Sequence, residues 1–250
     1  MQDDLKAQRT GLAMLGIALA AGLVIAALIV AGTFERIKRA GDTITVKGYA
    51  EEQVVSDVGL WRGNLTARAS VLQDAYARLD ADSARVVEFL RERIAGEGEL
   101  KPGPVSMSTR YEYTAQGVMT GQVAGYQLEQ SFEVTSSDVE LIAHVAREAS
   151  ALISEGIELN SWPPQYFYSD LNEVKVRLLG AATRDARLRA AQFADNSGVA
   201  VGPLKSAAQG VFQITRVNST ETADYGSYDT STIEKSVKAV VTIEYAVERD

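Results

Sequence analysis

Few side chains in this sequence have the types and spacing that support catalysis. The only histidine is His144, and the chain contains no cysteine. A hydrolytic triad needs a base beside its nucleophile, so one histidine leaves a single base of that kind. Without cysteine, thiolate nucleophiles, disulfides and cysteine-based metal sites are excluded. We predict that the protein is not an enzyme and has no catalytic residues, no metal site and no cofactor.

The polar stretch at 216–236 contains several side chains with oxygen atoms that could bind a cation. Its acidic side chains Glu221, Asp224 and Asp229, with Tyr225 and Tyr228 beside them, are groups that bind hard cations such as calcium. The stretch lacks the alternating ligands and the fixed glycine of a known calcium loop. We therefore predict a solvated, mobile loop, and the sequence does not decide whether it binds a cation.

Aromatic residues cluster around two prolines at 162–168. Prolines 163 and 164 cannot donate hydrogen bonds to a sheet, which predicts a sheet edge or a bulge at this point. The aromatic side chains either cover the core beneath an irregular strand or form an interface between proteins. The candidate oligomer-interface residues are Trp162, Tyr166, Phe167 and Tyr168.

The charge of the chain argues against nucleic acid as a partner. Its formal net charge is −8 at pH 7, and no basic stripe is interleaved with aromatic residues. Contact with phosphates requires such clustered Lys and Arg side chains. We predict that the protein does not bind nucleic acid.

The elements that position these residues follow from hydrophobic periodicity, which predicts an α+β domain over residues 43–249. Period-two alternation predicts antiparallel strands at 43–50, 58–69, 105–113, 126–134, 204–215 and 237–247. Helical periodicity predicts about three packed amphipathic helices. Their predicted starts are capping boxes at Ser70 with Gln73, Ser137 with Glu140 and Asp170 with Glu173.

An uncharged run at residues 10–34 precedes this domain. A helix of that length rises about 1.5 Å per residue and covers the hydrocarbon core of about 30 Å. We predict a single-pass transmembrane signal anchor at 11–34, between a short tail at 1–10 and a linker at 35–42. A cleaved signal is the alternative, with its best cleavage site at 29–31, but the run is longer than the apolar core of a signal peptide.

Small residues recur at four-residue spacing within that run. This spacing lets two membrane helices pack closely, although membrane anchors are often rich in such residues. The candidates for transmembrane packing are Gly16, Ala20, Gly22 and Ala26.

The order of several short motifs resembles the SIMPL-domain family. They are Thr43–Ala50, the strand pair around Asp57, the hairpin end Val123–Tyr126, and Ala182–Arg187 followed by 190–199. The resemblance covers about Thr43 to Val247. It implies an α+β domain with antiparallel strands, helices packed on the sheets, export to the periplasm and a tendency to self-associate. The family was long classed as a domain of unknown function, so the resemblance implies no activity.

These observations together predict a non-enzymatic envelope protein, anchored in the cell inner membrane with its domain in the periplasm. We expect it to form homo-oligomers such as rings, with a role in envelope integrity or stress response. One alternative is a periplasmic ligand- or peptide-binding module that uses the hairpin loop at 114–124 or the acidic loop at 216–236. A less favoured one is a hydrolase whose paired carboxylates meet only in space.

Overall fold

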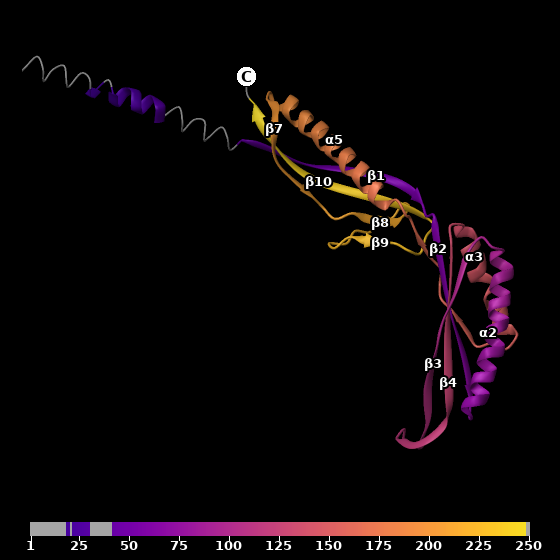
Figure 1. Ribbon diagram of the computed structural model, residues 1–250. Helices are drawn as coiled ribbons and strands as arrows, with labels where there is room; N and C mark the ends of the chain where they lie inside the picture. Colours follow the sequence, from indigo (N-terminus) through magenta and orange to yellow (C-terminus); the bar gives the residue numbers. More distant parts are fainter. Residues whose placement is uncertain (1–18, 21, 31–41, 249–250) are drawn as a thin grey trace, which may run out of the picture. The chain divides into compact units, whose positions relative to one another are not determined.

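The computed structural model describes residues 19–20, 22–30 and 42–248 (Figure 1). The chain divides into two compact units. Unit 1 consists of the chain up to Tyr49, Leu179–Gly210 and the chain from Val240, and unit 2 consists of Ala50–Leu178 and Val211–Ala239. Three elements contribute residues to both units: β1 (Thr43–Val55), α5 (Leu171–Ser197) and β10 (Glu234–Glu248).

Unit 2 is built on an antiparallel sheet in the order β3-β4-β2-β5, with β6 also paired with β2. These strands are β2 (Val58–Ala69), β3 (Glu99–Tyr113), β4 (Met119–Ser136), β5 (Leu159–Ser161) and β6 (Gln165–Phe167). The helices α2 (Leu72–Ile94) and α3 (Val139–Glu148) pack on one face of the sheet (Figure 1). The short helix α4 (Ser150–Ser154) leads into β5.

The core of unit 2 lies between this sheet and its helices. Because side chains alternate along a strand, one face of β2 presents Trp61, Leu65 and Ala67 to the helices, and all three are buried. The Trp61 indole nitrogen donates to the Ser161 hydroxyl at 2.9 Å, so its polar atom is satisfied in the core. Full burial of an apolar side chain of this kind stabilises the fold by roughly 1.5–3 kcal/mol.

The helices form where they are predicted, but two of their caps differ. The first residue before α2 is Val71, whose side chain makes no capping hydrogen bond, so the predicted box at Ser70 is wrong. At α3 the cap is Asp138 rather than Ser137, and its carboxylate accepts from the backbone nitrogens of Glu140 and Leu141 at 3.0 and 3.1 Å. A carboxylate one residue further along therefore serves the same exposed N–H groups.

In unit 1, α5 lies directly against the beginning of β1. A Cβ atom added at Gly48 would lie 2.7 Å from the Ala186 nitrogen and 2.8 Å from its Cβ, so only glycine fits there. The residues of α5 that face this glycine are Ala182 and Ala186. Both are small, and both are fully buried. On the strand side, β7 (Ala200–Gln209) pairs antiparallel with the second part of β10.

The predicted strand at 204–215 is two strands that pair with different parts of β10. In unit 2, β8 (Gln213–Arg216) pairs antiparallel with the first part of β10 and parallel with β9 (Ser227–Tyr228). The α+β class with mainly antiparallel strands is confirmed by this arrangement. Just after the end of β7, the Gly210 nitrogen donates to the Val240 carbonyl at 2.9 Å.

The predicted transmembrane helix, and with it the single-pass inner-membrane localisation, is wrong. Within the predicted span of 11–34, residues 19–20 and 22–30 are helical. No helix among the described residues is long and apolar enough to cross a membrane, which takes about 20 residues. Of the candidates for membrane packing, Ala20, Gly22 and Ala26 lie in the helical part. The rest of the span, with Gly16, the tail at 1–10 and the linker up to residue 41, lies outside the described residues.

Candidate functional site

Two of the family-like motifs, Thr43–Ala50 and Ala182–Arg187, meet in unit 1, where β1 packs against α5. We call this contact the packing joint. The Tyr49 nitrogen donates to the Asp185 carboxylate at 2.8 Å, next to the contact of Gly48 with the helix. This backbone hydrogen bond lowers the pKa of Asp185, and the Arg189 guanidinium, 2.8 Å away, lowers it further. Both motifs therefore have a structural role, because the Asp185 carboxylate binds the backbone of β1 and the Arg189 side chain.

Asp57, between β1 and β2, has a structural role in unit 2. Its carboxylate accepts from the Ser169 nitrogen at 2.8 Å and also from the Ser169 hydroxyl. Ser169 lies two residues before the start of α5. The two hydrogen bonds thus fix the chain where it enters that helix.

The lone histidine lies on the surface of α3. The His144 Nε2 atom is 3.2 Å from the Glu148 carboxylate, one helical turn away, and half of the His144 side chain is exposed. A pair of this kind at i,i+4 spacing contributes only a few tenths of a kcal/mol.

The stretch at 216–236 is held to the rest of unit 2 by hydrogen bonds. The Asp229 carboxylate accepts from the nitrogen and hydroxyl of Ser231 at 2.8 and 2.7 Å, and from the Thr232 hydroxyl. Burial alone would raise the pKa of Asp229, but these hydrogen bonds and the charge of Lys235 outweigh burial and lower it. The backbone is anchored as well, since the Tyr166 nitrogen donates to the Thr230 carbonyl at 2.8 Å.

The acidic candidates in this stretch do not converge. Glu221 lies 3.7 Å from Arg216, and Tyr225 is fully exposed. The Tyr228 ring instead lies 6.3 Å from the ring of Phe167. Within the described part of the chain, no group of three or more acidic or histidine side chains is placed to hold a metal ion.

A buried cation lies beside this stretch. The Lys235 side chain on β10 is fully buried, and its ammonium group donates to the Thr232 carbonyl. Burial lowers the pKa of Lys235, while the Asp229 carboxylate opposes that shift. Since Lys235 is closed to solvent, it holds the loop and has no access to a substrate.

The segment at 162–168 forms a bulged sheet edge, as predicted. Both β5 and β6 pair with β2, and the intervening residues 162–164 bulge out between them. Trp162 is 45 % exposed, whereas Tyr166 is 5 % exposed and belongs to the core of unit 2. Phe167 and Tyr168 are half-buried. Of the candidate interface residues, Trp162 thus offers the most surface to a partner.

A hollow of about 490 Å³ opens beside this bulge. Its apolar wall includes Leu60, Trp162 and the two prolines, and its polar groups include Arg62 and Gln165. The Arg62 guanidinium is held in place, because it donates to Glu133 at 3.0 Å and to Gln165 at 3.1 Å.

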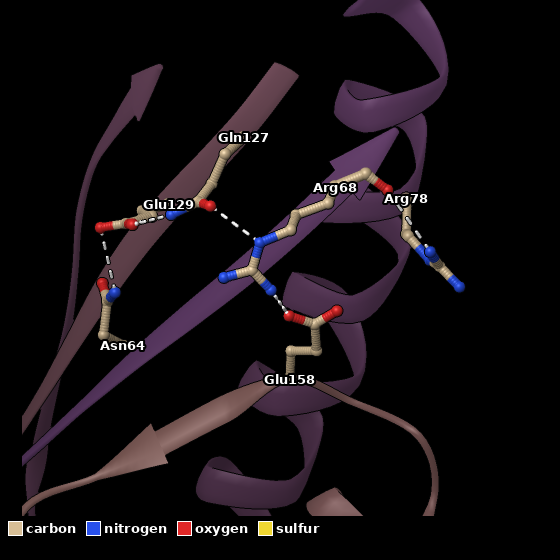
Figure 2. A network of polar contacts seen from close by, with 6 residues as sticks. All are labelled: Asn64, Arg68, Arg78, Gln127, Glu129 and Glu158. Carbon is tan, nitrogen blue, oxygen red and sulfur yellow. Dashed lines mark hydrogen bonds and ion pairs between the residues drawn. The ribbon is translucent and has the colours of Figure 1, made fainter. Parts of the chain in front are cut away.

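The face of this sheet opposite α2 and α3 carries a network of polar side chains (Figure 2). Arg68 donates to the Gln127 amide at 2.7 Å and pairs with Glu158. Gln127 and Asn64 in turn donate to the two oxygens of Glu129, at 2.6 and 3.3 Å. Because these groups satisfy one another, this face has the features of an ordinary solvated sheet surface.

The outer half of the β3–β4 hairpin, residues 105–125, is different, and we call it the arm. The pairing of β4 with β2 ends at Tyr126, so within the arm β4 pairs with β3 alone. Figure 1 shows the hairpin tip curving away from α2. The arm carries seven large apolar side chains that are each 41–65 % exposed: Val105, Met107, Tyr111, Tyr113, Val118, Met119 and Val123.

Most of these side chains share one face of the arm. The register opposes Met107 to Leu128, Tyr111 to Val123, and Tyr113 to Met119, and opposed residues in a ladder point to the same side. Leu128 belongs to the buried core beneath the helices. The apolar face of the sheet therefore continues into the arm, beyond the part that the helices cover.

A bulge lies within the arm, at the point where β4 leaves β2. The register shifts between Arg110 and Tyr111, opposite Gly125. A Cβ atom at Gly125 would lie 2.6 Å from the Ala69 carbonyl oxygen, at the end of β2. Glycine thus permits the close approach at which β4 leaves β2, a role that no local sequence pattern indicates. The alternation of Val105, Met107, Tyr111 and Tyr113 predicted the strand, but alternation does not reveal whether an apolar face is covered.

Comparison with solved structures adds little. An amidase of the hydantoinase/carbamoylase family from Burkholderia phymatum is 14 % identical, with 49 % of this chain and 33 % of that chain covered and a TM-score of 0.32. An uncharacterized conserved protein from Listeria innocua is 10 % identical, with 76 % and 91 % covered and a TM-score of 0.22. The chain spans about a third of the length of the amidase, and overlaps this weak carry no argument about activity.

Comparison by sequence is decisive for the family. No curated protein matches the chain. The profile of the SIMPL family, described as a protein of unknown function (DUF541), matches residues 44–245. This match covers most of the chain and confirms the resemblance seen in the motifs. The protein belongs to the SIMPL family.

Proposed function

We propose that this protein is a non-enzymatic assembly protein whose copies associate through the apolar face of the arm. The observation that carries the proposal is the exposed apolar face of residues 105–125, which continues the core side of the sheet without cover from α2 or α3. Contiguous apolar patches of this kind on soluble proteins mark interaction surfaces.

The size of the patch suits a protein interface. With 41–65 % of each side chain exposed, seven side chains offer roughly 600 Å² per copy, or about 1,200 Å² for two copies, which is the lower end of stable interfaces. A two-stranded ribbon alone is only marginally stable in water. Covering the apolar face of the arm with a second copy therefore stabilises both the ribbon and the complex.

The charge distribution favours a second copy as the partner at this surface. The chain has a net charge of −8, so two copies repel one another over most of their surfaces. The arm contains a single cation, Arg110, and a single anion, Glu112. Two arms can thus approach without the repulsion that the remaining surface imposes.

A non-enzymatic role is supported by how the polar groups of the chain are used. The carboxylates of Asp57, Asp185 and Asp229 each hold a backbone segment through hydrogen bonds. Lys235 is closed to solvent, and His144 pairs with a neighbouring carboxylate on the surface. Each of these groups has a structural task that explains its position.

The mass of the native protein in solution tests the proposal. Light scattering coupled to size-exclusion chromatography is expected to give a mass that is a multiple of 26.9 kDa and that falls on dilution. A constant monomer mass from low micromolar to several hundred micromolar protein refutes assembly.

The hollow beside Trp162 supports a second candidate function, the binding of a peptide. It combines an exposed aromatic side chain and two prolines with an oriented guanidinium, and binding sites typically join an apolar wall to a few fixed polar groups. Trp162 and the buried Trp61 are the two tryptophans of the chain. Titration with a tripeptide that ends in phenylalanine should therefore change the fluorescence of the native protein but not that of a Trp162→Phe variant; no change in either refutes this candidate.

A further inference from the structure

β3 is an edge strand whose outer half lacks the protection that edge strands usually carry. In the part of the chain that the structure describes, one edge of β3 pairs with β4, and no strand pairs with its other edge. Proteins protect such edges with prolines, charges or covering elements, because a free edge pairs readily with another strand. Pro102 and Pro104 protect the base of β3, whereas residues 105–113 contain no proline and only two charged side chains.

Those two charges, Arg110 and Glu112, have no ion-pair partner among the described residues. They lie two positions apart on one strand, so both point to the polar face of the arm. Both belong to exposed residues. Their spacing and opposite signs match a partner strand that presents the same two residues in reverse order.

We propose that β3 pairs antiparallel with β3 of a second copy, across a two-fold axis at Tyr111. This inference rests on the proposed assembly and adds a second contact to it, through the edge of the arm. The pairing places the apolar faces of two arms side by side as one wider face, which a further pair covers. In a symmetric antiparallel pair one residue opposes itself, and its neighbours oppose each other. With Tyr111 on the axis, Arg110 of each copy lies opposite Glu112 of the other, and 109–113 of the two copies form the ladder.

Neighbouring registers are less favourable. An axis at Arg110 places two guanidinium groups opposite each other, and an axis at Glu112 does the same with two carboxylates, which destabilises the pair. Axes nearer the base bring Pro102 or Pro104 into the ladder, where a proline removes a hydrogen bond. Self-pairing of Tyr111 also places two aromatic rings side by side on the apolar face.

Charge reversal tests this register. Arg110→Glu and Glu112→Arg each turn two attractive pairs into two repulsive ones, so each should weaken self-association by about tenfold or more. The double variant Arg110→Glu/Glu112→Arg restores both pairs and should associate within about twofold of the native protein. If all three variants associate like the native protein, the register is wrong.

Cross-linking gives an independent readout, because the native chain has no cysteine. Tyr111→Cys should form a disulfide-linked dimer under mild oxidation, since opposed residues in an antiparallel pair have Cα atoms about 5 Å apart. Ser108→Cys is the control, because its two copies would lie about 20 Å apart in this register. Equal dimer yields from the two variants overturn the proposal.

The outcomes separate this inference from the proposed function. A native protein that assembles, with charge variants that behave like the native protein, keeps assembly through the arm and removes the β3 pairing. A native protein that is monomeric at every concentration removes both.

Discussion

Replacing three large, exposed apolar side chains of the arm with threonine should dissociate the protein without unfolding it. The triple variant Met107→Thr/Tyr113→Thr/Met119→Thr introduces β-branched residues, which suit a strand. The native side chains are 56, 65 and 54 % exposed. Because they make few contacts within their own chain, we expect a change in unfolding free energy of about 0.5 kcal/mol or less for each.

The expected effect on association is much larger. If a partner covers about half of the exposed surface of these side chains, roughly 150 Å² per copy is removed from water, worth about 4 kcal/mol per copy. Only part of buried area converts into affinity, so we expect a loss of about 3 kcal/mol in total, or about 100-fold in the dissociation constant.

Sedimentation velocity over a concentration series measures this constant directly. The matched control is Val55→Thr/Leu204→Thr, which removes strand side chains that are 59 and 58 % exposed but lie outside the arm. The control should associate like the native protein. If the triple variant and the control give the same dissociation constant, the apolar face of the arm does not mediate assembly. Circular dichroism and thermal unfolding of each variant show whether the fold is retained.

Three further predictions concern stability. Gly48→Ala forces a Cβ to within 2.8 Å of Ala186 and should destabilise the fold by about 1–3 kcal/mol in thermal unfolding. The control is Gly180→Ala on α5, whose added Cβ has its nearest neighbour 3.6 Å away and should stabilise the fold by about 0.5–1 kcal/mol. Equal effects of the two variants contradict the packing joint. The pKa of Asp229 lies below its ordinary value of 3.8, so its contribution to stability is present above that pH and is lost as the pH falls through the lowered pKa; Asp229→Asn should remove this acid-dependent part from denaturant midpoints, and an unchanged acid limb contradicts it. The pKa of Lys235 in the folded protein lies below its ordinary value of 10.5. Between these two pKa values the unfolded chain binds more protons than the folded one, so stability should rise with pH up to 10.5. Lys235→Met should abolish this rise, and a rise that persists in the variant excludes Lys235 as its source.

The elements of this fold were predictable because their signals are local. Alternation located β2 and β4, and helical periodicity located α2, α3 and α5. The caps were less predictable, because Ser137 and Asp138 are both suitable capping residues and only the backbone conformation selects Asp138. The division of the predicted strand at 204–215 into β7 and β8 depends on which part of β10 each strand meets, and no local pattern records that.

The candidate site was largely unpredictable for the same reason. An alternating strand shows that one face is apolar, but the cover of that face depends on the length and placement of α2, which come from the rest of the chain. The exposed face of the arm therefore became visible only in three dimensions. Residue type likewise does not reveal burial. Tyr166 is of a type that is common at protein interfaces, but it lies in the core. The predicted membrane span relied on composition alone, and no helix among the residues described bears it out.

Hydrogen exchange of the arm at two protein concentrations tests the central claim most directly. At a concentration well above the dissociation constant, the backbone amides of 105–125 should exchange more slowly than in the diluted, dissociated protein, while the amides of α5 exchange equally in both. Equal exchange of the arm at both concentrations, in a protein shown to change its mass between them, would contradict the claim that copies associate through this surface.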